Sequence, residues 1–298
     1  MLYTLSKMAS AGQASGGNSQ IREEPFEFEG IPVAVYRGGA GAPIVLLHGS
    51  GPGASSIGNW RTVLGPLAEN FEVFAMDLVG FGKSGRRSGP LYFDYPLWLR
   101  QAAALLDRIQ GERIGVIGHS LSASLALALA AREPRVVGVV TTGAIGLPFE
   151  PTDATRRTWH CPRDRKELIA ALRGLIKNDA VIDEDYLRAR EAVILAPGYA
   201  EYFDAMFQGD AEQYIEAAAL DRATLERVAC PVLLMHGRDD QGFPPSVSTQ
   251  LAGYLRDADL VLLSECSHSV AFERTTTFLA LVREFFARHL ASDRENSQ

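Results

Sequence analysis

The chain has 298 residues, a formal net charge of −7 and 47% hydrophobic residues. That length and apolar content suit one large core, and an acidic balance without a basic stripe argues against nucleic acid as a partner. Three scattered cysteines and the lack of a bilayer-length apolar run argue against a disulfide framework, a thiolate zinc site and a membrane span, so we expect a cytoplasmic protein without metal or cofactor.

Residues 1–20 are rich in Ser, Gly, Ala and Gln and lack the apolar core of a signal peptide, which predicts a flexible N-terminal tail. Beyond the tail, apolar runs of strand length recur between helical patterns. Strands are expected near residues 32–36, 42–47, 71–76, 113–118, 136–141, 231–236 and 260–263. This alternation predicts an α/β fold with a mostly parallel sheet flanked by helices.

The strand signals stop between residues 146 and 227, where helical patterns take over. Helices are expected at residues 165–177, 183–195, 199–207 and 211–220. The sequence therefore predicts a core made of residues 21–145 and 228–292, with residues 146–227 inserted as a helical cap. Trp159 is expected on the inner face of this cap as a substrate contact, although an aromatic residue of an amphipathic helix is more often part of the core.

Residues 118–122, with the sequence GHSLS, lie between a predicted strand and a helix of small apolar residues. So tight a turn would present the hydroxyl of Ser120 above the strand ends, at a helix N-terminus that favours a developing anion. Ser120 is therefore a candidate nucleophile. Ser122 stands where such elbows usually have glycine, and an ordinary helix N-cap serine is the alternative interpretation of Ser120.

A serine hydroxyl needs a base, and an imidazole base needs an acid that holds its tautomer. Asp239 and Asp240 follow the strand expected at 231–236, at the sheet edge where catalytic loops lie. We expect Asp240 to be the acid, with Asp239 solvated or paired with Arg238.

Four histidines fall at or beside predicted strand ends: His48, His119, His236 and His268. Position alone therefore does not identify the base. His268 fits best, because it follows the last predicted strand and precedes a closing helix expected at Thr275–Leu290. The resulting chain order of serine, aspartate and histidine is the one expected of an α/β-hydrolase.

The loop at residues 48–53, with the sequence HGSGPG, follows the strand expected at 42–47. Its glycines allow backbone N–H groups to approach a ligand closely. An oxyanion hole needs two such donors, which the N–H of Leu121 and the N–H of Ser50 or Gly49 would supply. A nucleotide-binding loop is the weaker interpretation, because no Gly-Lys-Ser/Thr ending follows.

From about residue 23 to residue 289, the sequence resembles the meta-cleavage product hydrolases. These are α/β-hydrolases of aromatic catabolism that cleave a carbon-carbon bond in 2-hydroxy-6-oxo-hexa-2,4-dienoates. The motifs that carry the resemblance are HGSGPG at 48–53, NW at 59–60, DLVGFGKS at 77–84, GHSLS at 118–122, GAIGLPF at 143–149, GRDD at 237–240 and CSH at 266–268. The resemblance implies Ser120 as nucleophile, Asp240 and His268 as its partners, and Ser50 with Leu121 as oxyanion donors.

The same resemblance implies that Arg190 binds the carboxylate of a small organic acid and that Asn59 is a polar residue of the pocket. A guanidinium suits a planar carboxylate, although most arginines on a charged helix are solvated. His119 stands where the family often has asparagine, and Ser269 where it often has tryptophan. Both positions are expected to face the substrate, so the substrate need not be the family's usual one. Related enzymes commonly associate, which makes a homodimer possible.

Three other functions remain open from the sequence. A carboxylesterase or amidase of the same fold would use the same three residues. A cofactor-free oxygenase or lyase would keep the histidine-aspartate pair and use the serine only for hydrogen bonding. A ligand receptor of hydrolase descent is disfavoured by the complete set of serine, aspartate and histidine.

Overall fold

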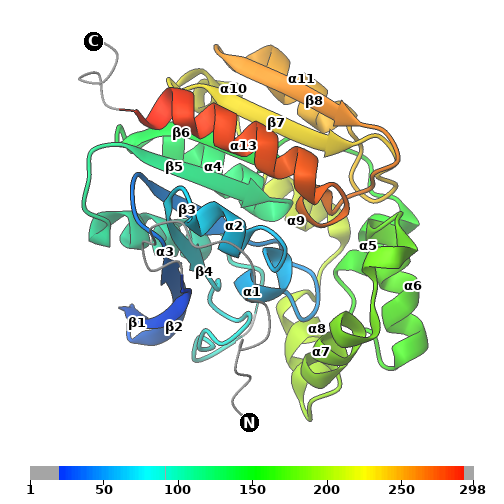
Figure 1. Ribbon diagram of the computed structural model, residues 1–298. Coiled ribbons are helices and arrows are strands. Elements are labelled where there is room, and N and C mark those ends of the chain that lie inside the picture. The colour runs from blue at the N-terminus through cyan, green and yellow to red at the C-terminus, as the bar shows by residue number, and fades with distance from the viewer. Residues whose placement is uncertain (1–19, 91, 292–298) are drawn as a thin grey trace, which may run out of the picture.

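An eight-stranded sheet organises the protein, whose computed structural model describes residues 20–90 and 92–291 (Figure 1). The strand order is β1-β2-β4-β3-β5-β6-β7-β8. The strands are β1 Arg22–Phe28, β2 Ile31–Gly38, β3 Pro43–Leu47, β4 Glu72–Met76, β5 Ile114–His119, β6 Val136–Thr142, β7 Val232–Gly237 and β8 Ala258–Leu263. β2 pairs antiparallel with β1 and β4, and every other pair is parallel. The mostly parallel sheet is confirmed.

All seven predicted strands are present with bounds within about two residues of those expected, and β1 was missed. β1 lies at the edge of the sheet, where only its Phe26 and Phe28 are buried. Its Pro25 is tolerated there because an edge strand has an unpaired side. The tight turn to β2 uses Glu29 and Gly30, both with positive φ. The tail expected at residues 1–20 lies, apart from its last residue, outside the described residues.

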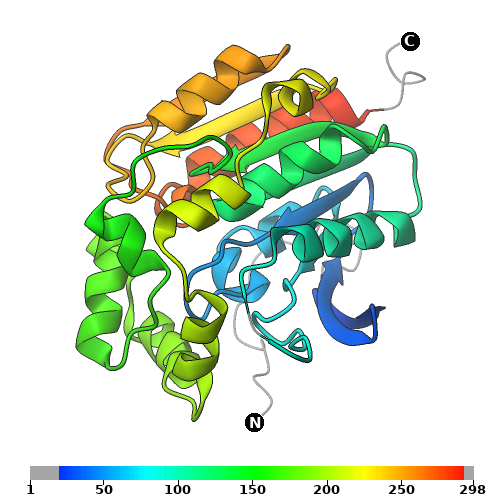
Figure 2. The same cartoon turned by 180° about the vertical axis from the view of Figure 1, so that it is seen from behind.

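Helices cover both faces of the sheet (Figures 1 and 2). Those of the core are α1 Ser56–Asn59, α2 Leu64–Ala68, α3 Tyr95–Arg108, α4 Leu121–Ala130, α11 Ser246–Tyr254, α12 Val270–Glu273 and α13 Thr275–Leu290. α2 and α13 pack on one face, and α3, α4 and α11 on the other. Each residue of α4 is buried, so this helix is apolar all round, as expected between a sheet and a second helix layer.

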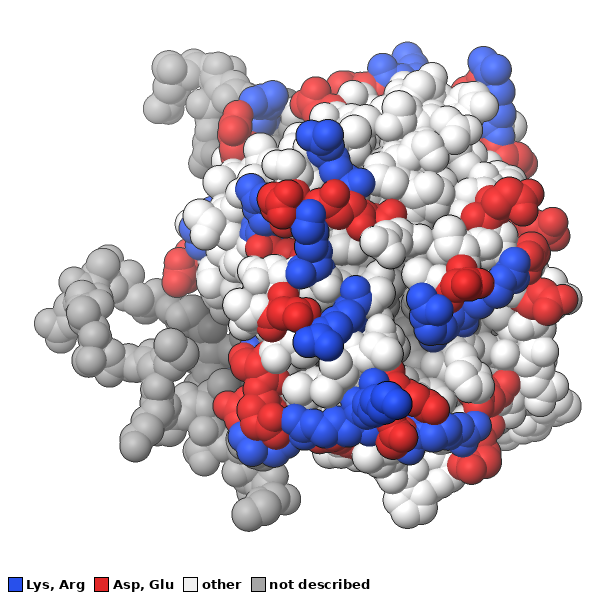
Figure 3. Space-filling model, turned by 90° about the vertical axis from the view of Figure 1, so that its right-hand side faces the viewer, with Lys and Arg blue, Asp and Glu red and all other residues white. Residues whose placement is uncertain are grey.

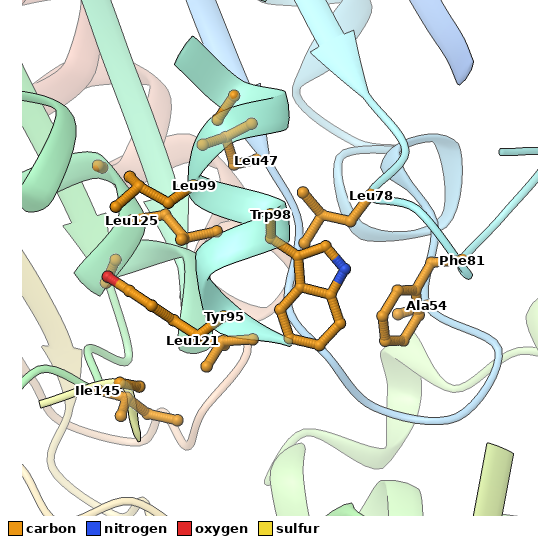
Figure 4. Close-up of a cluster of buried hydrophobic side chains, with 14 of the residues drawn as sticks. Leu47, Ala54, Leu78, Phe81, Tyr95, Trp98, Leu99, Leu121, Leu125 and Ile145 are labelled. Carbon is orange, nitrogen blue, oxygen red and sulfur yellow. The ribbon is translucent and has the colours of Figure 1, made fainter. Parts of the chain in front are cut away.

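The apolar layer behind Ser120 is built where α3 and α4 meet. Figure 4 shows Tyr95 and Trp98 of α3 packed among Leu121 and Leu125 of α4. The Tyr95 hydroxyl lies 2.8 Å from the hydroxyl of Ser124, so the aromatic ring is fixed at its polar end as well. Close packing of this kind restrains the position of the first turn of α4.

The stretch between β6 and β7, called the insert below, is helical as expected. Its elements are α5 Asp153–Thr158, α6 Arg165–Leu175, the 3-10 turn η1 Asp179–Val181, α7 Glu184–Ile194, α8 Tyr199–Met206, α9 Ala211–Ala217 and α10 Arg222–Glu226. The insert lies beyond the carboxyl ends of the parallel strands (Figures 1 and 2). Basic and acidic side chains are interspersed over the face that Figure 3 shows, and pairs such as Arg165 with Glu191, at 2.9 Å, join neighbouring helices.

Within the described residues, none of the helices combines the length and the apolar character that a bilayer crossing requires.

Candidate active site

Ser120 sits at a sharp turn between β5 and α4. Its φ of +56° and ψ of −120° are rare for a residue with a side chain, and such strain is found mainly at functional positions. Neighbouring backbone holds the turn, because Ser120 N donates to Thr142 O at 2.9 Å and Ser120 O accepts from Ile145 N at 3.2 Å. A Cβ at Gly118 would lie 2.1 Å from Ser122 O, so this position of the turn requires glycine.

The serine at position 122 is accommodated without opening the turn. Its buried hydroxyl donates to the carbonyl oxygen of His48, which begins the glycine-rich loop after β3. This bond ties the first turn of α4 to that loop. The departure from the usual glycine therefore adds a link between two parts of the site.

The glycine-rich loop lies directly against the turn that carries Ser120. A Cβ at Gly49 would come within 3.2 Å of Ser120 Cβ. The Ser50 hydroxyl accepts from Trp159 Nε1 at 2.9 Å, which fastens the loop to the insert. Neither Ser50 N nor Leu121 N donates to a protein acceptor in the described part of the chain. Both N–H groups are therefore available to an oxygen bound beside Ser120.

Asp240 and His268 come together as the sequence predicts. Asp240 Oδ2 lies 2.7 Å from His268 Nδ1, and both side chains are almost completely buried. The other carboxylate oxygen accepts from Gly242 N at 3.1 Å and from Phe243 N at 2.9 Å. Burial by itself raises the pKa of the Asp240 carboxyl, but the charge of His268 and hydrogen bonds from two histidines outweigh it and hold that pKa below its usual range.

Asp239 takes no part in this contact. It was expected to be solvated or paired with Arg238; it is partly exposed, and its ion pair is with Lys177 at 2.8 Å. Lys177 follows α6 of the insert, so this pair bridges the insert and the loop after β7.

The ring of His268 lies among three close neighbours. A Cβ at Gly143 would lie 2.7 Å from its Nδ1, the ring of Phe243 stacks on it at 4.3 Å, and the ring of His119 lies 4.7 Å away. Since Nδ1 is bound to Asp240, Nε2 is the free ring nitrogen. The structure contains no hydrogen bond between His268 and the Ser120 hydroxyl, and such bonds are often long before substrate binds.

His119 is fixed as a neutral imidazole beside His268. Its Nδ1 lies 3.2 Å from Thr142 O and 3.0 Å from Thr142 Oγ1. Burial lowers the pKa of His119 well below its ordinary value, and nearby His268 lowers it further. A neutral ring can serve as a hydrogen-bonding group without adding positive charge next to His268.

Three of the four predicted substrate contacts line one small cavity of about 30 Å³. Its lining is Gly58, Asn59, His119, Tyr186, Arg190, Ser269, Ala271 and Phe272. Trp159, the fourth predicted contact, is outside it. The Trp159 indole N–H donates to the Ser50 hydroxyl. Its ring stacks with that of Phe207, with the ring centroids 6.3 Å apart, in the aromatic interior of the insert.

Arg190 brings a positive charge to this cavity without a negative partner of its own. Its Nη1 donates to Pro52 O at 2.6 Å and its Nη2 to the Tyr186 hydroxyl at 3.2 Å. Its Nε is buried and has no hydrogen-bond partner. None of the ion pairs found among the described residues includes Arg190. A carboxylate of a ligand would satisfy this guanidinium.

The insert is bonded directly to the loop that carries His268. The carbonyl oxygen of Leu175, at the end of α6, accepts from His268 N at 3.0 Å and from Ser269 N at 3.2 Å. Glu273 accepts from Lys177 N at 2.7 Å and from Ser267 N at 2.9 Å, so one buried carboxylate holds both sides. Sequence reasoning missed these contacts, because neither Leu175 nor Glu273 belongs to a recognisable motif.

His236 is a further residue that sequence reasoning left unassigned. It is buried at the end of β7 and lies 3.1 Å from Asp240 Oδ2, the same oxygen that contacts His268. The sequence places His236 at a strand end, four residues before Asp240, but neither signal predicts the contact without knowing that the loop folds back. No group of three or more His, Cys, Asp or Glu side chains suited to a metal ion occurs among the described residues.

Known proteins share this fold. The model of the alpha/beta hydrolase fold family matches residues 42–275. The chain is 31% identical to the 2-hydroxy-6-oxo-2,4-heptadienoate hydrolase of Pseudomonas putida F1 over 87% of this chain and 94% of that protein. It is also 31% identical to the 2-hydroxymuconate semialdehyde hydrolase of Pseudomonas sp. CF600, over 87% of this chain and 91% of that one.

Solved structures show the same likeness. The meta-cleavage product hydrolase from Pseudomonas fluorescens IP01, crystallised as a serine-to-alanine mutant with acetates, superposes with a TM-score of 0.84 and 28% identity, over 89% of this chain and 97% of that chain. The 2-hydroxy-6-oxo-6-phenylhexa-2,4-dienoate hydrolase from Rhodococcus sp. RHA1 superposes with a TM-score of 0.82 and 26% identity, over 90% of this chain and 99% of that one. This chain therefore belongs to the α/β-hydrolase fold family and, within it, to the meta-cleavage product hydrolases.

Proposed function

We propose that this protein hydrolyses a carbon-carbon bond in a 2-hydroxy-6-oxo-hexa-2,4-dienoate formed by ring fission in aromatic catabolism. The observation that carries the proposal is Arg190, a partly buried cation without a carboxylate partner, in a cavity that also contains His119 next to Ser120. A negatively charged substrate would neutralise the charge of Arg190. The printed names of two relatives, a heptadienoate hydrolase and a muconate semialdehyde hydrolase, support this substrate class.

In this proposal Ser120 is the nucleophile, His268 the base and Asp240 the acid that holds the base. Nδ1 of His268 is occupied by Asp240 at 2.7 Å, so Nε2 is the nitrogen that exchanges protons with Ser120 and with substrate. The buried carboxylate stabilises the imidazolium that forms when His268 accepts a proton. The strained backbone at Ser120 keeps its hydroxyl at the start of α4, where the helix dipole favours an anion.

The reaction proceeds in balanced steps. The substrate loses the proton of its 2-hydroxyl and gains one at C5, which converts the dienol to a ketone through proton exchange with His268. Ser120 Oγ then attacks the C6 carbonyl and passes its proton to His268, which gives a tetrahedral oxyanion at C6. Collapse of this oxyanion breaks the C5–C6 bond, and the electron pair leaves as a dienolate that takes the proton from His268. Neutral His268 next deprotonates the water that attacks the acyl-Ser120 ester, and it returns this proton to Ser120 Oγ as the second fragment leaves as a carboxylic acid.

Three further groups bind the substrate in this scheme. Arg190 pairs with its carboxylate, and Asn59 and His119 supply hydrogen bonds from the cavity wall. The N–H groups of Leu121 and of Ser50 or Gly49 stabilise the oxyanion formed at C6. Trp159 acts by holding the Ser50 hydroxyl, which keeps the loop at its distance from Ser120.

We propose that residues 146–227 are a cap over this site. The cavity lined by Asn59, His119 and Arg190 is small, about 30 Å³, which supports a cap that moves away from the core to admit a dienoate. Cytoplasmic location and assembly as a homodimer are part of the same proposal. Light scattering on the purified chain tests the dimer, and cell fractionation tests the location.

The decisive experiment mixes the purified enzyme with ring-fission products and follows loss of the dienolate absorbance. Equal amounts of a hydroxypentadienoate and a carboxylic acid are expected. Ser120→Ala should lower kcat by about 10³-fold or more. Ser246→Ala, at the first turn of α11, is a matched serine control that should keep activity.

Two outcomes would contradict the proposal. Rapid cleavage of p-nitrophenyl esters without any dienoate turnover would favour a carboxylesterase. Nearly unchanged turnover by Ser120→Ala would leave the histidine-aspartate pair as the working unit and favour an oxygenase or lyase, which dioxygen consumption distinguishes.

A further inference from the structure

Asp240 is contacted by two histidines on one oxygen. His268 Nδ1 lies 2.7 Å and His236 Nε2 lies 3.1 Å from Asp240 Oδ2. His236 projects from the end of β7 and is completely buried, so it has no access to substrate or bulk water. The mechanism proposed above gives this buried imidazole no role.

The contacts of His236 determine which ring nitrogen carries its proton. Nε2 lies 3.1 Å from Asp240 Oδ2 and 3.0 Å from Phe243 O. A carbonyl and an ionised carboxylate only accept hydrogen bonds, so Nε2 must be the donor. Nδ1 lies 2.7 Å from the hydroxyl of Ser248 in α11, which can donate to it. Ser248, His236, Asp240 and His268 thus form one chain of hydrogen bonds in which a neutral His236 satisfies every partner.

We propose that His236 is a positioning residue for the reaction: as a neutral imidazole protonated on Nε2, it fixes the carboxylate of Asp240 toward His268 and takes up part of its negative charge. The proposal rests on the function assigned above to His268 and Asp240. It does not depend on which substrate the enzyme cleaves.

The choice of oxygen favours this role over simple packing. Asp240 Oδ1 is already held by Gly242 N and Phe243 N, so the carboxylate has a backbone anchor without His236. His236 instead contacts Oδ2, whose charge stabilises the His268 imidazolium. A donor on that oxygen weakens its attraction for the proton on His268. His236 also donates to Phe243 O, and the ring of Phe243 stacks on His268, so two of the groups around the base, Asp240 and Phe243, are held by one side chain.

Other titratable groups lie near this chain of hydrogen bonds. His119 faces His268 from β5, and Glu273 faces the pair from α12. Cys266 and Asp239 lie on the adjoining loops, where Asp239 is paired with Lys177. None of these groups contacts His236 among the described residues, so a change at position 236 reaches His268 through Asp240.

The first test needs no substrate. Long-range proton-nitrogen NMR spectra of the full chain, labelled with ¹⁵N in its six histidines, report the tautomer of each ring. We expect His236 to carry its proton on Nε2 alone at neutral pH. A proton on Nδ1, or on both nitrogens, would overturn the proposal even if the enzyme cleaves dienoates.

The second test compares two amides at position 236. His236→Gln can place an N–H near the Nε2 position, whereas the shorter His236→Asn reaches only the Nδ1 position and leaves Asp240 without that donor. The titration midpoint of His268 should rise by about one pH unit in His236→Asn, as expected when a hydrogen bond to a charged group is lost. It should return toward the wild-type value in His236→Gln. His160→Gln replaces a mostly exposed histidine of the insert; it is the control and should leave the titration midpoint of His268 unchanged.

Kinetics then connect this shift to the reaction. The acid limb of the kcat profile should move upward with the His268 midpoint in His236→Asn, while KM stays the same. A folded His236→Asn protein whose His268 midpoint coincides with wild type would refute the inference. If that variant does not fold, Ser248→Ala replaces it: Nε2 of His236 should keep its proton, because Asp240 Oδ2 and Phe243 O still only accept hydrogen bonds, and a proton found on Nδ1 in this variant would refute the inference. If the His268 midpoint shifts in His236→Asn but the wild-type protein cleaves no dienoate, only the proposed function is contradicted.

Discussion

Replacement of Arg190 by glutamine should weaken substrate binding without removing the chemistry. The guanidinium has five N–H donors and uses one for Pro52 O and one for the Tyr186 hydroxyl, which leaves three donors and a full charge for the substrate carboxylate. A hydrogen bond to a charged group contributes about 1.5–3 kcal/mol, so its loss corresponds to an increase of about 10- to 150-fold in the dissociation constant. The kcat value should fall much less than binding does.

The assay is an absorbance titration of a dienoate in the Ser120→Ala background, where the dissociation constant is measured without turnover. Arg190→Lys should fall between wild type and glutamine, because it keeps the charge but loses the planar pair of donors. Arg188→Gln is the matched control on the same helix, since Arg188 is mostly exposed and pairs with Asp185. An unchanged dissociation constant in a folded Arg190→Gln protein would refute the assignment of Arg190 to the carboxylate.

Three other predictions concern the frame around the site. Ser122→Ala should leave the elbow intact but free the His48 carbonyl, costing about 1–3 kcal/mol of stability, which urea unfolding measures. Glu273→Ala removes the acceptor of three backbone N–H groups and should cost about 3 kcal/mol or more; a difference below 1 kcal/mol in the same assay would contradict it. The folded-state pKa of Asp240 lies below its unfolded value of about 3.9, so the stability it adds is present above that pH and is lost as pH falls further. Asp240→Asn should flatten the acid part of the stability curve in unfolding experiments from pH 6 to pH 3, and an equally steep decline would contradict the shift.

Local sequence predicted the features that depend on local geometry. The spacing of glycine and serine in residues 118–122 indicated a tight turn, and the structure has a positive φ at Ser120. Asp240 and His268 each follow a buried strand, and the ends of neighbouring parallel strands lie together, so the 2.7 Å contact between them could be anticipated. The helical insert was predicted because its apolar residues recur with helical spacing and no strand pattern interrupts them.

What the sequence could not predict depends on partners that are distant in the chain. β1 was missed because only two of its seven residues are buried, which leaves too little alternation to recognise. The contact of His236 with Asp240 requires the loop after β7 to fold back on its own strand. For Asp239 the sequence favoured solvation or a pair with Arg238, but its ion-pair partner is Lys177, 62 residues away in the chain. The sequence favoured Trp159 as a substrate contact, and its hydrogen bond to Ser50 has no signature in either segment.

The hydrogen bonds from His268 N and Ser269 N to Leu175 O connect the loop that carries the base directly to the insert. Any outward swing of α6 large enough to admit a substrate has to break these bonds or drag the loop with it. If the insert moves as the proposed cap, the imidazole of His268 is realigned only when the insert closes, so the open enzyme would hydrolyse esters poorly. Chimeras that exchange the insert to alter substrate preference should accordingly retain residues 175–178 with their partner Glu273.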